Sequence, residues 1–64
     1  MDISHLLGTR LQNSGFTLEE PDDHLVVLKF KGQEVASWNT HKVLHKTIIE
    51  ECNKFLYTYE HNLS

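Results

Sequence analysis

The sequence predicts an α+β fold, in which a three-stranded antiparallel sheet carries two helices on one face in the order αβββα. Three observations support this prediction. β-Branched and aromatic residues are concentrated between residues 16 and 38. Gly32 interrupts that region where a tight hairpin turn needs a positive φ angle. The segments on either side repeat apolar residues every three or four positions, as amphipathic helices do.

The first predicted helix occupies residues 2–14. Its apolar stripe consists of Ile3, Leu6, Leu7 and Leu11. Gly15 is predicted to end the helix, because glycine readily takes the left-handed conformation of a helix C-terminus. We expect Gly8, inside the helix, to be tolerated on the surface at a cost of up to about 1 kcal/mol.

The sheet is predicted to begin with a short strand, residues 16–20. This strand ends at Pro21, which lacks the backbone donor that a sheet needs. Strands 25–30 and 34–38 then form a hairpin, and Gly32-Gln33 is expected to be its two-residue loop.

The position of the loop decides which residues share a face. Residues equidistant from the turn lie opposite one another, so Phe30 should pair with Val35 and Val27 with Trp38. The helix-covered face would then carry Val26, Leu28, Phe30 and Val35. The other face would carry Leu25, Val27 and Trp38.

An exposed apolar patch with an aromatic anchor is typical of an interaction surface. We therefore predict that Leu25, Val27 and Trp38 hold a protein partner or form a homodimer. The alternative is that loops or the C-terminal tail cover these three side chains.

The second helix is predicted to follow an N-cap at Asn39 or Thr40 and to run to about Glu60. Its apolar positions advance by three or four residues, at Val43, Leu44, Ile48, Cys52, Phe55 and Tyr59. Among these, we expect Cys52 to fill core space rather than to act as a nucleophile.

Four basic residues fall in the first turns of this helix, namely His41, Lys42, His45 and Lys46. Cations at a helix N-terminus oppose the helix dipole, and a position that breaks a local rule is a candidate functional site. We predict that these side chains bind RNA, another anion or a partner's carboxylates. The alternative is a solvated cluster offset by neighbouring acids.

His41 and His45 are also spaced so that two imidazoles on one helix could share a metal ion. No further ligand stands at local spacing, and the glutamate of a metalloprotease helix is missing. We therefore expect no metal site and no small-molecule cofactor.

His24 is the candidate catalytic residue. It follows Asp22 and Asp23, and a nearby carboxylate would favour a protonated imidazole suited to proton transfer or phosphate contact. The alternative is that His24 is a turn residue at the edge of a strand.

Composition limits the class of protein. The 64 residues make one small domain, 1–64, and the net charge of -3 argues against strong non-specific binding to nucleic acid. The single Cys52 cannot form an intramolecular disulfide, which indicates a reducing compartment. No apolar run approaches the roughly 20 residues of a membrane span, and no secretory signal follows Met1, so we expect a cytoplasmic protein without membrane contact.

The order of elements resembles double-stranded-RNA-binding-like folds, and residues 6–55 resemble the small HicA-type mRNA interferase toxins. The matching features are Gly15-Phe16 after the first helix, Asp22-Asp23-His24 in place of a Gly-Ser-His motif, Gly32 in the hairpin turn, and residues 42–49 of the last helix. This resemblance implies that His24 acts in proton transfer during metal-independent RNA cleavage. Asp22-Asp23 departs from the family's Gly-Ser and would repel phosphate.

Two functions follow as hypotheses. The first is a non-catalytic interaction module that binds a protein partner or itself through the sheet face around Trp38. The alternative is an RNA-directed protein, either an interferase that uses His24 or a binder that uses Lys42 and Lys46.

Overall fold

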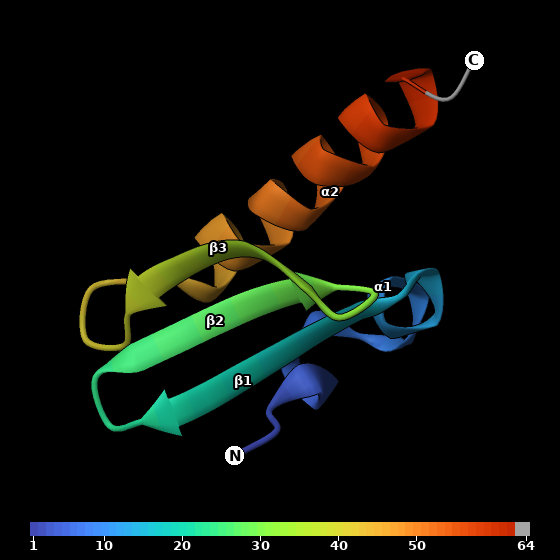
Figure 1. Cartoon of the computed structure of the whole chain (residues 1–64). Helices are drawn as coiled ribbons and strands as arrows, with labels where there is room; N and C mark the ends of the chain where they lie inside the picture. Colours follow the sequence, from blue (N-terminus) through green and yellow to red (C-terminus); the bar gives the residue numbers. More distant parts are fainter. Residues whose placement is uncertain (63–64) are drawn as a thin grey trace.

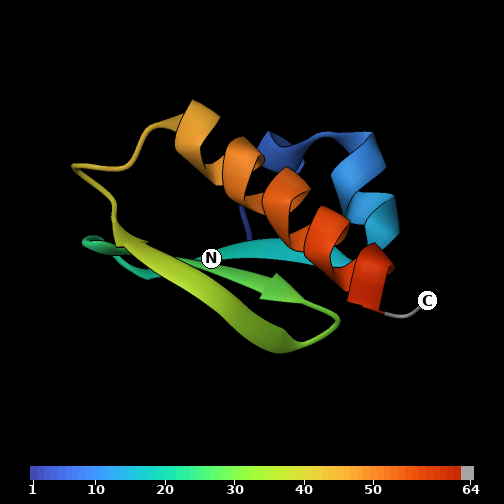
Figure 2. The same cartoon turned by 90° about the horizontal axis from the view of Figure 1, so that it is seen from above.

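The computed structural model describes residues 1–62 and confirms the α+β fold. Its elements are a 3-10 helix η1 (Ser4–Leu7), α1 (Thr9–Ser14), β1 (Phe16–Asp22), β2 (Leu25–Phe30), β3 (Gln33–Asn39) and α2 (His45–Asn62). The strands form one antiparallel sheet in the order β1-β2-β3 (Figure 1). The N-terminal helical segments and α2 lie side by side over the same face of this sheet (Figure 2).

The N-terminal helical region is broken at Gly8 instead of running through it. Gly8 has φ 85° and ψ 160°, outside the helical range, so η1 ends there and α1 begins afresh. The expectation of a tolerated internal glycine is therefore wrong. Gly15 does end α1, with φ 115° in the left-handed region. The break keeps Leu7 and Leu11 buried on either side of it.

The outer edge of β1 is covered by the N-terminal residues. The backbone N–H of Ile3 donates to the Leu18 carbonyl at 2.9 Å, and that of Glu20 donates to the Met1 carbonyl at 2.8 Å. The hydroxyl of Ser4, which is buried, accepts the Leu18 N–H at 2.9 Å. These bonds satisfy backbone groups that an edge strand would otherwise present unpaired.

β1 continues through Pro21 to Asp22, two residues beyond its predicted end. Its pairing with β2 is irregular between Glu19 and Asp22. An irregular edge position is where a strand tolerates proline, since no ladder donor is required there.

The hairpin turn is Lys31-Gly32, one residue earlier than predicted. Both residues have positive φ, 52° and 86°, as the two central residues of a type I′ turn do. A positive φ is unusual for lysine, and local contacts offset its cost. The Lys31 N–H donates to the Gly15 carbonyl at 2.9 Å, and the ammonium lies 5.2 Å from the centre of the Phe30 ring.

A bulge in β3 places Trp38 on the helix-covered face. The register shifts by one residue at Val35, and beyond it Trp38 pairs with Val26 of the core. Val35 and Trp38 are three positions apart, so regular alternation would send them to opposite faces, whereas the extra residue lets both pack against the core. The expectation that Trp38 shares a face with Val27 is wrong.

α2 begins at His45, several residues later than predicted. Asn39 caps a turn instead of the helix, because its side chain accepts the His41 N–H at 2.9 Å and its carbonyl accepts the Val43 N–H at 3.0 Å. Leu44, expected on the apolar stripe, is 66% exposed in this connection.

The core lies between the sheet and the helices. An aromatic cluster occupies one end of it, where the Phe30 ring centre lies 4.8 Å from that of Phe16 and 5.0 Å from that of Phe55. Cys52, in the middle of α2, is fully buried on the side of the helix that faces the sheet. Such ring pairs add to the stability that burial alone supplies.

Candidate functional site

The sheet face turned away from the helices does not carry the predicted aromatic patch. Leu25 and Val27 lie on it, but Val27 is only 7% exposed and Trp38 belongs to the opposite face. The face is crossed by an ion pair, with Lys29 Nζ 3.5 Å from a Glu19 carboxylate oxygen. The three residues predicted to hold a partner together therefore do not form one surface.

His24 and His41 meet at one end of the sheet. The β1–β2 turn and the β3–α2 connection lie side by side there (Figure 1), and the two imidazole ring centres are 5.6 Å apart. The Thr40 N–H donates to the His24 carbonyl at 2.9 Å, and the Asp22 carboxylate accepts the His24 N–H at 2.7 Å. Both histidines are exposed, so this pair is open to solvent.

The four basic residues predicted to act together are divided between three locations. His41 and Lys42 precede the helix, and His41 contacts His24. The Nε2 of His45 lies 2.5 Å from the Leu6 carbonyl, a distance that requires this nitrogen to donate. Lys46 lies 3.8 Å from the Glu50 carboxylate on the exposed side of α2.

Cys52 is a core residue, as predicted. Burial, and to a smaller extent the charge of Glu51, raises the pKa of its thiol to about 11. The thiol therefore stays protonated at neutral pH, and the thiolate is the form that reacts.

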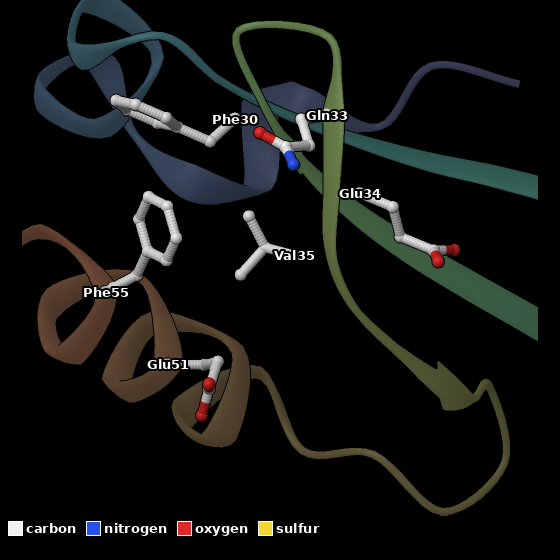
Figure 3. Close-up of a pocket in the computed structure, with 6 residues that line it drawn as sticks. All are labelled: Phe30, Gln33, Glu34, Val35, Glu51 and Phe55. Carbon is white, nitrogen blue, oxygen red and sulfur yellow. The ribbon is translucent and has the colours of Figure 1, made fainter. Parts of the chain in front are cut away.

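A cavity of about 250 Å³ opens between the start of β3 and α2. Phe30, Val35 and Phe55 point toward one another across it, from β2, β3 and α2 respectively (Figure 3). Its remaining lining residues are polar, namely Gln33, Glu34 and Glu51. The cavity thus has apolar walls and a polar rim that includes two carboxylates.

This cavity adjoins the free edge of the sheet. β3 is the last strand in the sheet order, and residues 33–38 show no backbone hydrogen bond to any described segment other than β2. An edge of this kind offers a row of donors and acceptors to an added strand. Backbone groups and an apolar cavity are therefore available next to each other.

A second, smaller cavity of about 190 Å³ lies beside the start of α2, between Ile3 and Val43. Its walls are largely apolar, and Thr40, one of its lining residues, has a hydroxyl without a hydrogen-bond partner among residues 1–62. That hydroxyl is buried, and the other polar residues that line this cavity are Glu20 and His45.

No helix among residues 1–62 is both long and apolar enough to cross a membrane. Within the same residues, no group of three or more His, Cys, Asp or Glu side chains is placed to hold a metal ion.

We did not predict the β3 edge or its cavity from the sequence, because regular alternation through the hairpin places Trp38 on the opposite face of the sheet. One signal was present in the sequence. Val35 and Trp38 are the large apolar residues of this strand, and their spacing of three residues is incompatible with one face of a regular strand. That spacing predicts a bulge whenever both residues are buried.

Comparisons of this chain with protein families, with curated proteins and with solved structures find no match. The resemblance to HicA-type interferases accordingly stays a prediction. The function is therefore inferred from the geometry of the chain.

Proposed function

We propose that this protein is a small, non-catalytic interaction module that binds a protein partner by adding a strand of the partner to the outer edge of β3. The observation that supports the proposal is the open edge of β3 directly beside the cavity formed by Phe30, Val35 and Phe55. Main-chain bonds along such an edge supply affinity, and pockets for side chains supply specificity. This surface replaces the sheet face around Trp38.

The bulge limits where a partner can pair. Residues 36–39 follow it and continue in regular register with β2. An added strand can pair with this regular segment. The added strand must leave the edge at Val35, because the hydrogen-bond ladder is locally disrupted there. The partner's chain would pass the cavity at that point.

The test is a selection of peptides from a random twelve-residue library on the immobilised chain, followed by amide hydrogen exchange of the complex by NMR. We expect bound peptides to slow exchange of alternate β3 amides, because only every second amide of an edge strand faces outward. Val35→Lys should abolish this binding, and Ser37→Thr, an exposed change in the same strand, should preserve it. Peptides that bind elsewhere, or no selected peptide at all, would contradict the proposal.

An RNA-directed function is the second candidate, and the contact of His24 with His41 beside Lys42 is the observation that favours it. Two imidazoles and an ammonium at one exposed end of the sheet suit contacts to phosphate. Incubation of the chain with labelled RNA at low salt, comparing wild type with His24→Ala and His41→Ala, tests this candidate. Absence of both cleavage and binding in the wild type would refute it.

A further inference from the structure

The cavity beside β3 also indicates the chemistry of the partner, and the following inference rests on the proposed function. We infer that the added strand carries an apolar side chain that enters the cavity and a basic side chain two residues away that pairs with Glu51. The partner is thus an extended protein segment of the pattern apolar-x-basic.

The apolar position follows from the walls. Phe30, Val35 and Phe55 converge on the space (Figure 3), and Phe30 is itself part of the buried core. A cavity of about 250 Å³ accommodates one large aliphatic or aromatic side chain. Filling it would remove the exposed surfaces of Val35 and Phe55 from water, which favours binding through the hydrophobic effect.

The basic position follows from the charges. Glu34 and Glu51 line the cavity, and no lysine, arginine or histidine does. Neither carboxylate forms an ion pair within residues 1–62, although Glu51 is half-buried. A carboxylate without a cation attracts one brought by the partner, and the attraction strengthens when the bound segment excludes water from the pair.

The spacing follows from strand geometry. Side chains at positions i and i+2 of a strand point to the same face, whereas position i+1 points to the other. Glu51 lies on α2, over the helix-covered face that the apolar side chain enters, whereas Glu34 lies on β3 itself. Both carboxylates point away from the three apolar residues (Figure 3), so they belong to the polar rim of the cavity. A cation that reaches Glu51 therefore belongs two residues from the apolar anchor.

A second copy of this chain is a poorer occupant. It would bring its own Glu34 and Glu51 and a net charge of -3 to the same interface. Antiparallel pairing of two β3 strands about Ala36 would also have to run through both bulges at Val35. Charge and register thus both favour a basic partner segment over self-association.

The experiment compares two synthetic nine-residue peptides by NMR titration. The first, Gly-Thr-Lys-Thr-Phe-Thr-Lys-Thr-Gly, has lysine two residues to either side of phenylalanine, and the second has glutamate in place of both lysines. We expect the lysine peptide to shift the amide signals of β3 and to bind at least roughly fivefold more tightly than the glutamate peptide at low salt. Glu51→Lys should invert this preference.

Glu50→Gln is the matched control, because Glu50 is exposed on the same helix and does not line the cavity. Glu51→Gln should weaken binding of the lysine peptide by roughly fivefold, and Glu50→Gln should leave it within about twofold. Equal binding of both peptides at β3, or equal effects of the two variants, would overturn the inference but leave strand addition intact. Failure of every peptide to perturb β3 would count against the proposed function itself.

Sedimentation of the peptide-free chain completes the test. We expect a monomer at micromolar concentration. A stable dimer in which the β3 amides are protected from exchange would show that a second copy occupies the edge, and it would overturn the inference.

Discussion

The outer edges of β1 and β3 belong to the same small sheet, but only the edge of β1 is covered by another described segment. β1 is completed by the chain's own N-terminal residues, through backbone bonds between Ile3 and Leu18 and between Glu20 and Met1. Within the described residues, β3 has no such cover. A domain that closes one edge with its own backbone and leaves the other open directs any added strand to a single place.

Two features of β3 oppose pairing of its open edge with another edge. The bulge at Val35 interrupts its regular hydrogen-bonding pattern, and Glu34 puts a charge beside the interruption. Both devices discourage indiscriminate pairing between edges. The comparison therefore separates an edge that the chain closes with its own backbone from an edge that it leaves open but irregular.

The largest effect is expected at Trp38, which anchors the open edge to the core. Trp38→Ala should lower the free energy of unfolding by about 2 to 3 kcal/mol, because a partly buried indole is removed from between the sheet and the helix. Urea denaturation followed by circular dichroism measures this change. Ser37→Ala, an exposed neighbour, should stay within about 0.5 kcal/mol of wild type, and equal losses in the two variants would contradict the inward placement of Trp38.

A somewhat smaller effect is expected at the closed edge. Ser4→Ala removes the hydroxyl that accepts the Leu18 N–H and should cost about 1 to 2 kcal/mol, because a buried donor is left without its partner. The same denaturation experiment applies, with Thr9→Ala, an exposed change on α1, as control. A neutral Ser4→Ala would show that other groups hold the N-terminal residues on β1.

The next prediction concerns Cys52, which lies in the core that both edge strands pack against. Its folded-state pKa is raised to about 11 from an ordinary value of 9.0, so the neutral thiol contributes stability that is complete below pH 9 and is lost as pH rises toward 11. We expect this loss to reach about 1 to 2 kcal/mol. Between pH 8 and 11, the free energy of unfolding of Cys52→Ala should fall less steeply than that of the wild type. Parallel curves for the two proteins would contradict the raised pKa of the Cys52 thiol.

The last test needs no substitution, because amide exchange of the wild type compares the two edges directly. The Leu18 and Glu20 amides, bonded to Ser4 and Met1, should exchange about as slowly as those in β2. The outward amides of residues 36–39 should exchange at least roughly tenfold faster. Similar rates at the two edges would mean that β3 is covered in solution.

The fold was predictable because local signals agreed with one another. The apolar stripe of 2–14, the glycine at 15 and the β-rich region around Gly32 each favour one structure. The predicted register of the β2–β3 hairpin was wrong, because register depends on tertiary contacts. Lys31 accepts a positive φ because Gly15 and Phe30 lie beside it in the folded chain, and no local pattern indicates that neighbourhood.

The candidate site was less predictable than the fold for the same reason. Its walls come from β2, β3 and α2, so the cavity exists only once Phe30, Val35 and Phe55 are assembled. The predicted patch of Leu25, Val27 and Trp38 depended on a face assignment that the bulge reverses. The contact between His24 and His41 likewise joins two loops that are distant in sequence.

The extra residue in β3 is what keeps the open edge irregular. Deleting Val35 would leave Ala36, Ser37 and Trp38 opposite Leu28, Val27 and Val26, so the indole would stay in the interior. The strand would nevertheless become a regular ladder along its whole length, without the irregularity that restrains edge-to-edge growth. For this fold, a single deleted amino acid separates a discrete module from one prone to assemble into extended sheets.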